Sequence, residues 1–431
     1  MSETVHNSEI QATQDPAPID TPYAGSIKIS VISSLGQIPI ENATVTISYT
    51  GDPDSPVETL TTDSSGQTPI IELPAPPLGL SLDASSEEQP YSVYNIQVTA
   101  EGYEPILVSG SEIFADQLSL QPIRMNPLES TDEAEKIVII PAHTLFGVFP
   151  PKIPEDEIKP MPDTGEIVLS RVVIPEYVIV HDGVPQDSTA PNYWVRYKDY
   201  IKNVASCEIY STWNENALYA NILAIMSFTL NRVYTEWYRN QGYDFTITSS
   251  TAYDQKWVYG RNIYENIDYL VDTVFANYLS RPSVRQPILT SYCDGNRVTC
   301  DGLSQWGSQY LAEEGYSAIE IIRYYYGNDM YINTAEFVSG VPSSWPGYNL
   351  TIGSSGDKVR QLQTQLNRIA RNYPALPTIT PDGVYGPATA DAVRTFQGIF
   401  NLPQTGVTDY ATWYEISEIY VGVTRIAEPG Q

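Results

Sequence analysis

The first third of the chain alternates apolar and polar residues one by one. This period of two begins at 27–31 and returns at 43–49 and 94–98, with turn-forming residues such as Asp-Ser-Ser-Gly between the runs. Short strands at close spacing are typical of a β-sandwich, so we predict an all-β sandwich over residues 25–127. The preceding residues 1–24 are polar and punctuated by proline, and we expect them to form a disordered tail.

The pattern changes to helical spacing in the middle of the chain. Apolar residues recur every three or four positions over 218–233, which predicts a buried helix of about five or six turns. Thr212 and Glu215 have the Ser/Thr-x-x-Glu spacing of a capping box, so we expect the helix to start there. Glu208 lies just ahead of this predicted start.

Glu208 is flanked by Cys207 and by the aromatic residues Tyr210 and Trp213. A carboxyl group at a buried helix entrance tends to keep its proton near neutral pH, because low dielectric disfavours the charged form. A retained proton is what a general acid needs. The alternative interpretation is an ordinary solvated residue in a turn.

The spacing of apolar residues in the rest of the chain predicts two more domains. Residues 176–340 are rich in aromatic residues and mix both periods, so we expect an α+β domain. Its expected strands cover 245–253 and 286–292, and its expected helices cover 267–278, 303–312 and 318–326. Residues 349–424 show helical spacing broken by Asp-Gly and Thr-Gly turns, which predicts a small all-α helical bundle. The chain is therefore expected to be multidomain.

A connector over residues 128–175 joins the sandwich to the α+β domain. It opens with acidic residues, continues with the β-rich segment Ile137–Ile140, and then carries closely spaced prolines that favour extended backbone. Segments of this length without regular structure are usually functional or flexible. Two interpretations stay open, a spacer and an exposed activation segment that a protease cuts.

Charge and composition limit the kinds of partner that we expect the chain to bind. The formal net charge is −29, and residues 1–135 hold 21 acidic against two basic residues. We expect no nucleic-acid partner, because phosphate binding requires a basic face. We also expect no membrane span and no signal peptide, because no apolar run approaches the ~18 residues of a span and the first twenty residues lack an apolar core.

Few side chains are available as metal ligands. The chain has three His and three Cys, and His181 is the one histidine in the central domain. Structural and catalytic zinc sites use three or four such ligands, so we expect no metal and no cofactor. Cys293 and Cys300 could join two further ligands or form a disulfide. Cys207 would need a histidine base to act as a nucleophile, so we expect a small packed residue there.

Residues along the C-terminal domain carry a first resemblance to a known family. They are Leu350, Gly353, Gly356, Val359, Leu362, Gln363, Leu366, the turn 382–386, Thr389, Val393, Phe396, Gln397, Leu402, Thr405, Gly406, Asp409, Thr412 and Trp413. The domain resembles the small helical peptidoglycan-binding domain found on many cell-wall hydrolases. Asp382, Phe396 and Trp413 are candidates for wall contact, although such aromatic residues more often belong to the core.

Two blocks in the central domain carry a second resemblance. The first is Glu208 with Trp213 five residues on, and the second is Gly-Leu-Ser-Gln-Trp-Gly at 302–307, followed by Tyr-Tyr-Tyr-Gly at 324–327. Together they resemble the catalytic domain of stage II sporulation protein D (SpoIID/LytB-like). The chain departs from the family pattern at Tyr219, Asn221, Met226 and Thr299.

This resemblance implies a lytic transglycosylase with Glu208 as its single acid and base. An ordinary glycosidase needs two carboxylates, whereas this reaction needs no water and hence no second one. Asp254, Asp294 and Asp301 could assist, but turn roles are expected for them. The expected substrate-binding residues are Gln255, Trp257, Ser304, Gln305 and Trp306.

The order of the domains resembles the spore-cortex-lytic enzyme precursors (SleC-type). That resemblance implies a zymogen in the spore, at the cortex or the coat–cortex boundary. A subtilisin-like protease would cut it in the connector, and the enzyme would then degrade the glycan strands of cortex peptidoglycan. Two alternatives remain, a non-catalytic peptidoglycan-binding scaffold and an N-acetylmuramoyl-L-alanine amidase. The scaffold is motivated by the altered residues Tyr219, Asn221 and Met226.

Overall fold

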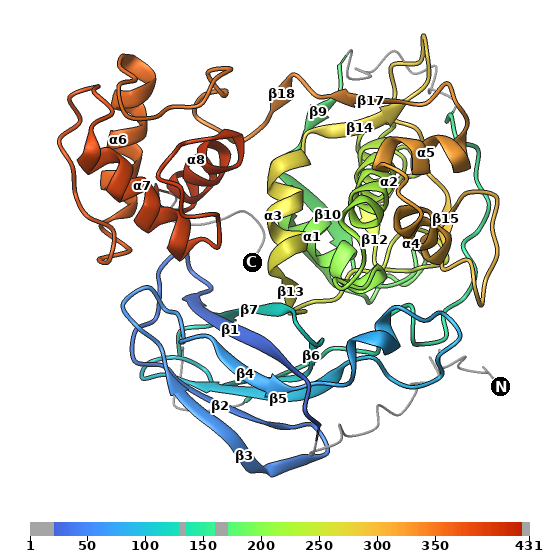
Figure 1. The fold of residues 1–431 in the computed structure, drawn as a ribbon, viewed down its shortest axis with the longest axis horizontal. Helices are drawn as coiled ribbons and strands as arrows, with labels where there is room; N and C mark the ends of the chain where they lie inside the picture. The colour runs from blue at the N-terminus through green and yellow to red at the C-terminus, as the bar shows by residue number, and fades with distance from the viewer. Residues whose placement is uncertain (1–20, 129–134, 160–170, 425–431) are drawn as a thin grey trace.

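The structure, a computed structural model, describes residues 21–128, 135–159 and 171–424, and these form three parts (Figure 1). The N-terminal part consists of β-sheets, the central part mixes helices with short strands, and the C-terminal part consists of helices. The predicted order of an all-β, an α+β and an all-α part is confirmed by the order of the helices and strands. Most of the predicted disordered tail lies outside the described residues.

The alternating pattern forms two sheets that share one core. The first sheet orders β3 (Asp52–Thr61), β2 (Thr44–Tyr49), β5 (Ser92–Thr99), β6 (Ile106–Ile113) and β8 (Lys136–Ile139). The second orders β13 (Ile263–Tyr264), β7 (Leu118–Met125), β1 (Ala24–Ser33) and β4 (Ile71–Pro74). Ile29 of β1 and Val45 of β2 are fully buried in the same cluster. A short 3-10 helix, η1 (Leu78–Ser81), follows β4.

Two strands of these sheets come from outside the predicted sandwich. The connector supplies β8, which runs parallel to β6, and the central part supplies β13, which pairs antiparallel with β7. A buried ion pair lies beside this junction, because Arg261 Nη2 is 2.5 Å from Glu112 Oε2. The N-terminal part and the central part are therefore joined by backbone hydrogen bonds and by a buried charge pair.

The central part is built around the helices α1 (Tyr197–Glu208) and α2 (Glu215–Tyr234). The other elements are η2 (Arg239–Gln241), α3 (Glu265–Val274), α4 (Gln305–Glu313) and α5 (Ala318–Tyr326), with the strands β9 (Val173–Ile174), β10 (Tyr177–His181), β11 (Asn192–Arg196), β12 (Ile247–Thr248), β14 (Asn277–Ser280), β15 (Tyr292–Cys293), β16 (Leu303–Ser304), β17 (Tyr331–Thr334) and β18 (Phe337–Val338). The predicted long helix is α2, and most of its residues are buried.

The start of α2 differs from the prediction. Asn214 is its N-cap, and the Asn214 side chain accepts a hydrogen bond from the N–H of Asn216 at 2.9 Å. The predicted capping box at Thr212 is therefore wrong, and asparagine is as effective a cap as threonine. The helix α1 was not predicted, so Glu208 ends one helix rather than only preceding the next.

Three further boundaries were wrong. The strand predicted over 245–253 is reduced to β12, and the strand predicted over 286–292 is reduced to β15. The helix predicted over 267–278 ends with α3, because the chain turns there into β14. In the segment 286–292, the N–H of Ile288 donates to the carbonyl of Leu279 and that of Leu289 to the carbonyl of Glu157, so its backbone pairs with two different segments and no long strand forms.

The C-terminal part contains α6 (Asp357–Ile369), α7 (Pro387–Ile399) and α8 (Tyr410–Thr424). It contacts the central part through α8. Lys198 of α1 lies at the centre of this contact, with Nζ 3.0 Å from Asp272 Oδ1 and 2.5 Å from Glu415 Oε2. All three side chains are largely buried, so charged groups that look solvated in the sequence join two domains.

Candidate active site

Glu208 lies at the C-terminal end of α1, and its residue is only 4% exposed. Its Oε1 accepts a hydrogen bond from the backbone N–H of Lys256 at 2.7 Å. Its Oε2 lies 3.4 Å from Nε2 of Gln305, which begins α4. The structure therefore brings together two of the residues that the sequence singled out, from segments 97 positions apart.

Burial raises the pKa of the Glu208 carboxyl above its usual value. The Lys152 ammonium, the N–H of Lys256 and a hydrogen bond with Tyr292 oppose this shift without cancelling it. The C-terminal end of a helix also disfavours a negative charge. Glu208 thus keeps its proton to higher pH than a solvated glutamate, as a general acid requires.

A cavity of about 200 Å³ opens beside Glu208. Gln305 and Tyr292 line it, together with a loop that the Cys293–Cys300 disulfide closes. This disulfide decides between the two interpretations of these cysteines. Asp294 lies in the loop and accepts hydrogen bonds from the N–H groups of Asn296 and Val298, which is a turn role.

The connector forms another wall of this cavity. We call its residues 147–159 the strap, because they run across the central part beside Glu208. Lys152 of the strap is half-buried and donates a hydrogen bond to the backbone carbonyl of Asp254. Its Nζ lies 4.6 Å from the ring centre of Phe228 and 4.4 Å from that of Tyr292. Burial lowers the pKa of the Lys152 ammonium, while Glu208 acts in the opposite direction.

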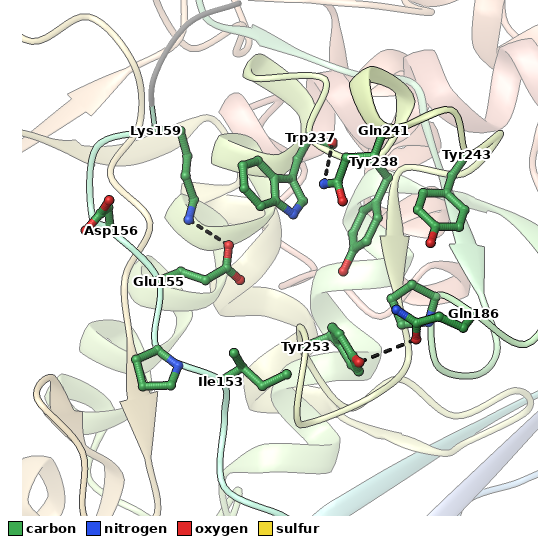
Figure 2. Close-up of a pocket in the computed structure, with 12 residues that line it drawn as sticks. Ile153, Glu155, Asp156, Lys159, Gln186, Trp237, Tyr238, Gln241, Tyr243 and Tyr253 are labelled. Carbon is green, nitrogen blue, oxygen red and sulfur yellow. Dashed lines mark hydrogen bonds and ion pairs between the residues drawn. The ribbon is translucent and has the colours of Figure 1, made fainter.

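The strap continues to a second, larger cavity of about 560 Å³ (Figure 2). The backbone secures it along the way, since the N–H of Ile153 donates to the carbonyl of Ala252 at 2.7 Å. The N–H of Leu289 likewise donates to the carbonyl of Glu157 at 2.8 Å. The strap is thus packed against the central part, which does not fit a free spacer. The predicted processing site stays a prediction, because residues 129–134 and 160–170 lie outside the described residues.

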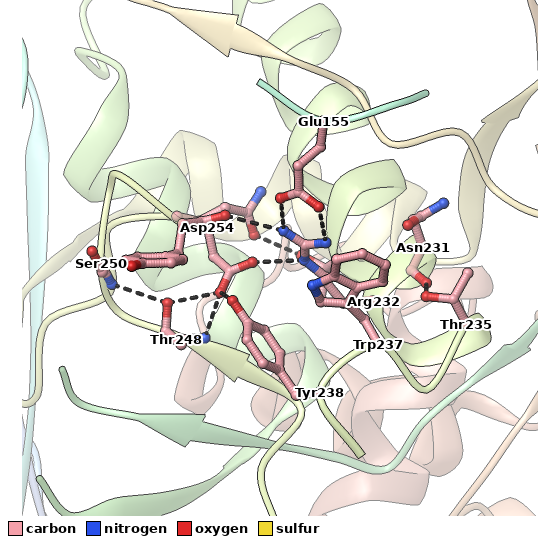
Figure 3. A network of polar contacts seen from close by, with 12 residues as sticks. Glu155, Asn231, Arg232, Thr235, Trp237, Tyr238, Thr248, Ser250 and Asp254 are labelled. Carbon is pink, nitrogen blue, oxygen red and sulfur yellow. Dashed lines mark hydrogen bonds and ion pairs between the residues drawn. The ribbon is translucent and has the colours of Figure 1, made fainter. Parts of the chain in front are cut away.

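A charged network holds the strap to α2 (Figure 3). Arg232 of α2 donates to both carboxylate oxygens of Glu155, at 3.0 and 2.5 Å, and to Asp254 Oδ1 at 2.7 Å. Asp254 also accepts hydrogen bonds from the hydroxyl of Tyr238 and from the hydroxyl and N–H of Thr248. Asp254 is fully buried with every oxygen engaged, so it cannot serve as a second catalytic carboxylate while this network stands.

Gln255 is also fully engaged. Its amide accepts from the hydroxyls of Tyr200 and Thr229 and donates to the carbonyl of Ile225 and to the Tyr292 hydroxyl. The structure therefore gives this predicted sugar-binding residue a positioning role, in which it orients Tyr292 toward Glu208.

The other predicted substrate-binding residues have structural contacts. Ser304 is the N-cap of α4 and accepts a hydrogen bond from the N–H of Gly307 at 2.9 Å. Trp257 and Trp306 are buried, and the Trp306 ring packs 4.9 Å from that of Trp213. Neither indole offers a free face for stacking on a sugar here. Asp301 is exposed directly after the disulfide loop.

The candidate wall-contact residues divide in the same way. Phe396 and Trp413 are fully buried, so they form the core of the C-terminal part. Asp382 is exposed at a turn, where it accepts hydrogen bonds from the N–H of Val384 and from Gln363 Nε2. These hydrogen bonds lower the pKa of the Asp382 carboxyl. Asp382 is thus the member of this set that can reach a ligand.

Sequence reasoning missed Tyr292 and Lys152. Tyr292 was assigned to a strand, and nothing in its neighbourhood marks it as a partner of Glu208. Lys152 stands alone among prolines and apolar residues in the connector. That single cation in an extended apolar segment is the one available signal. Cys207 is packed as expected, and burial raises the pKa of its thiol to about 12.

The described residues offer neither a grouped set of metal ligands nor a membrane-spanning helix. Within residues 21–128, 135–159 and 171–424, no three His, Cys, Asp or Glu side chains are grouped to hold a metal ion. Across the same residues, no helix has both the length and the apolar character that crossing a membrane requires.

Comparison with known proteins identifies the C-terminal part. The peptidoglycan binding domain family matches residues 355–416. The zinc D-Ala-D-Ala carboxypeptidase of Streptomyces albus G is 40% identical over 77 residues, which cover 18% of this chain and 28% of that protein. The chain thus spans little more than a quarter of that relative's length.

Among solved structures, the likeness is slight. The Bacillus anthracis TIE protein gives a TM-score of 0.18 at 13% identity and covers 25% of this chain and 17% of its own. A cohesin–X-dockerin complex from Acetivibrio cellulolyticus gives 0.16 at 17% identity, over 23% of this chain and 56% of that one. The family match supports one conclusion: the chain carries a C-terminal peptidoglycan-binding domain, which indicates a cell-wall-associated protein.

Proposed function

We propose that this chain is the precursor of a lytic transglycosylase that cleaves the glycan strands of spore-cortex peptidoglycan. The observation that carries the proposal is the buried Glu208 carboxyl, which faces a cavity beside Gln305 in a chain with a peptidoglycan-binding domain. The resemblance of both sequence blocks to the SpoIID/LytB-like catalytic domain supports it. Localisation in the spore and action during germination belong to the same proposal.

The proposed reaction uses Glu208 twice. Its carboxyl proton passes to the bridging oxygen as the bond from C1 of N-acetylmuramic acid to the next sugar breaks. The resulting carboxylate removes the proton from the C6 hydroxyl of the same muramic acid, and O6 bonds to C1. The products are a free hydroxyl and a 1,6-anhydro ring, and Glu208 is protonated again. No water enters, so the engagement of Asp254 by Arg232 is no obstacle.

Tyr292 and Gln305 position the carboxyl in this scheme. Tyr292 hydrogen-bonds Glu208 and is itself held by Gln255 at 3.1 Å. Gln305 Nε2 lies 3.4 Å from Oε2 of Glu208, within reach when the carboxylate forms. Both are neutral donors, so they stabilise the transient carboxylate without fixing Glu208 in the charged state.

The strap supports the precursor part of the proposal. Its residues fill one side of the cavity, and Lys152 lies where a glycan would approach Glu208. We therefore expect a subtilisin-like protease to cut within the connector and free the cavity. The uncut chain should then be less active than a chain cut between residues 160 and 170.

The test is Glu208→Gln in the cut chain. The amide has nearly the shape of the carboxyl but no acidic proton, so release of soluble cortex fragments should fall by about a thousandfold or more, the range of an essential acid or base. Wall binding in a sedimentation assay should be unchanged. Glu236→Gln, at an exposed glutamate just beyond α2, is the matched control and should remain active.

A non-catalytic wall-binding scaffold is the second candidate. The observation that favours it is that Gln255, Trp257 and Trp306 are all engaged or buried, which leaves few polar groups free to hold a sugar. Wall binding by the cut chain without any release of fragments would support the scaffold and contradict the enzyme.

A further inference from the structure

The cavity at the far end of the strap has a lining that differs from the rest of the surface. Four aromatic side chains converge on it, namely Trp237, Tyr238, Tyr243 and Tyr253 (Figure 2). They come from the segment after α2 and from the loop after β12. Trp237, Tyr243 and Tyr253 are only half-buried, so parts of their rings remain accessible.

Polar groups stand among these rings. The amide side chains of Gln186 and Gln241 are exposed at the cavity, and Gln186 Oε1 accepts a hydrogen bond from the Tyr253 hydroxyl at 3.4 Å. The carboxylates of Glu155 and Asp156 also line the cavity, and ring faces beside amides, hydroxyls and carboxylates match a ligand with apolar C–H faces and many hydroxyls. The cavity volume of about 560 Å³ lies within the usual range of about 300–1,000 Å³ for small-ligand sites.

The position of this cavity relates it to Glu208. Strap residues Pro151 and Lys152 line the Glu208 cavity, and the next residues, Ile153 and Pro154, line the aromatic one. On the facing loop, Thr251 lines the first cavity and Tyr253 the second. The two cavities therefore lie end to end along the strap, as two subsites for one polymer would.

We propose that the aromatic cavity is a saccharide-binding subsite, which holds the glycan strand on one side of the bond that Glu208 cleaves. This inference deepens the proposed function and rests on it for the identity of the polymer. Its ligand class is a strand of N-acetylated amino sugars. Trp237 and Tyr243 supply ring faces, and Gln186 and Gln241 supply hydrogen bonds.

The strap restricts this subsite in the uncut chain. Lys159 Nζ lies 4.5 Å from the ring centre of Trp237 and 2.6 Å from Glu155 Oε2. The ammonium thus occupies a ring surface that a sugar would otherwise cover. Removing the Lys159 side chain should therefore improve sugar binding, while removing the Trp237 ring should weaken it.

The test is binding of N,N′,N″,N‴-tetraacetylchitotetraose to the full chain, measured by calorimetry, which needs no catalysis. Trp237→Ala should weaken binding by at least about tenfold, the usual cost of a central aromatic anchor. Lys159→Ala should strengthen it several-fold. Trp194→Ala, which removes an exposed tryptophan elsewhere in the same part, is the matched control and should leave affinity unchanged.

Gln241→Ala keeps the test valid if Trp237→Ala misfolds, because Gln241 is exposed and its loss leaves the core intact. It should weaken binding about threefold or more, as loss of one hydrogen bond does. Equal affinity in the wild type and in the Trp237 and Gln241 variants would overturn the subsite. So would binding of a D-Ala-D-Ala-ended stem peptide in place of the sugar. Sugar binding that depends on Trp237, without any cleavage by the cut chain, would leave the subsite standing and refute the proposed reaction.

Discussion

Replacement of Lys152 by alanine tests the contact between the strap and the Glu208 cavity. The wild-type ammonium donates to the carbonyl of Asp254, lies over the rings of Phe228 and Tyr292, and faces Glu208. Alanine removes all of these contacts together with the apolar stem of the side chain. The strap should then open more often.

The magnitude follows from the contacts that are lost. Two cation–π contacts contribute about 0.5–2 kcal/mol each, and a hydrogen bond from a charged donor contributes about 1.5–3 kcal/mol. Burial of the ammonium costs several kcal/mol, which offsets most of this sum. About three buried methylene groups add roughly 2 kcal/mol. A net loosening of about 2–3 kcal/mol corresponds to about 30- to 150-fold more frequent opening.

Hydrogen exchange followed by mass spectrometry measures this opening in the full chain. The protected N–H groups of Ile153 and Lys159 report on it, and exchange over 147–159 should accelerate by the factor given above. Lys136→Ala is the matched control, because Lys136 also lies over a ring, that of Tyr259, but outside the cavity. An exchange rate over 147–159 that is the same in both variants would refute the role of Lys152.

Three other predictions concern stability and binding. Burial raises the pKa of Glu208 in the folded chain, so the folded state becomes less stable as pH rises from the unfolded pKa of about 4.5 through the folded pKa. The melting temperature of Glu208→Gln relative to that of the wild type should therefore be higher at pH 7 than at pH 4, and an equal difference at both pH values would contradict this. Glu112→Gln leaves the Arg261 guanidinium buried without its counter-charge, so denaturant unfolding should show a loss of about 3 kcal/mol, whereas the exposed Glu58→Gln should be neutral. Gln363→Leu removes the hydrogen bonds that hold the turn at Asp382, so wall sedimentation should weaken, and full binding would show that this turn is not part of the wall site.

The periodicity of apolar residues was sufficient to predict many of the strands and helices. The strands β1, β2 and β5 and the helices α2 and α5 follow their hydrophobic patterns closely, because β1 and α5 bury one face and the other three bury most of their residues. The helix α1 was missed for a specific reason. Its residues are almost all buried although it contains Lys198 and Lys202, whose partners Asp272 and Asp268 lie on α3. Charges that look solvated in the sequence are neutralised by a helix that is distant along the chain.

The candidate site was predictable only in part. Glu208 and Gln305 carry a motif, and the structure places them side by side. The roles of Gln255 and Trp257 could not be read from the sequence, because their partners come from several separate segments. Lys152 reaches the cavity from the connector, where its one sequence signal is a lone cation among prolines and apolar residues. Side chains that work by long-range contact leave no periodic signal.

The sugar ends of the released cortex fragments test the central claim most directly. Cortex digested by the cut chain should give fragments that end in 1,6-anhydro-muramic acid, each lighter by one water than a hydrolysis product, and Glu208→Gln should give none. Reducing ends that carry the added water, or free stem peptides with intact glycan, would contradict the account of Glu208 as both acid and base.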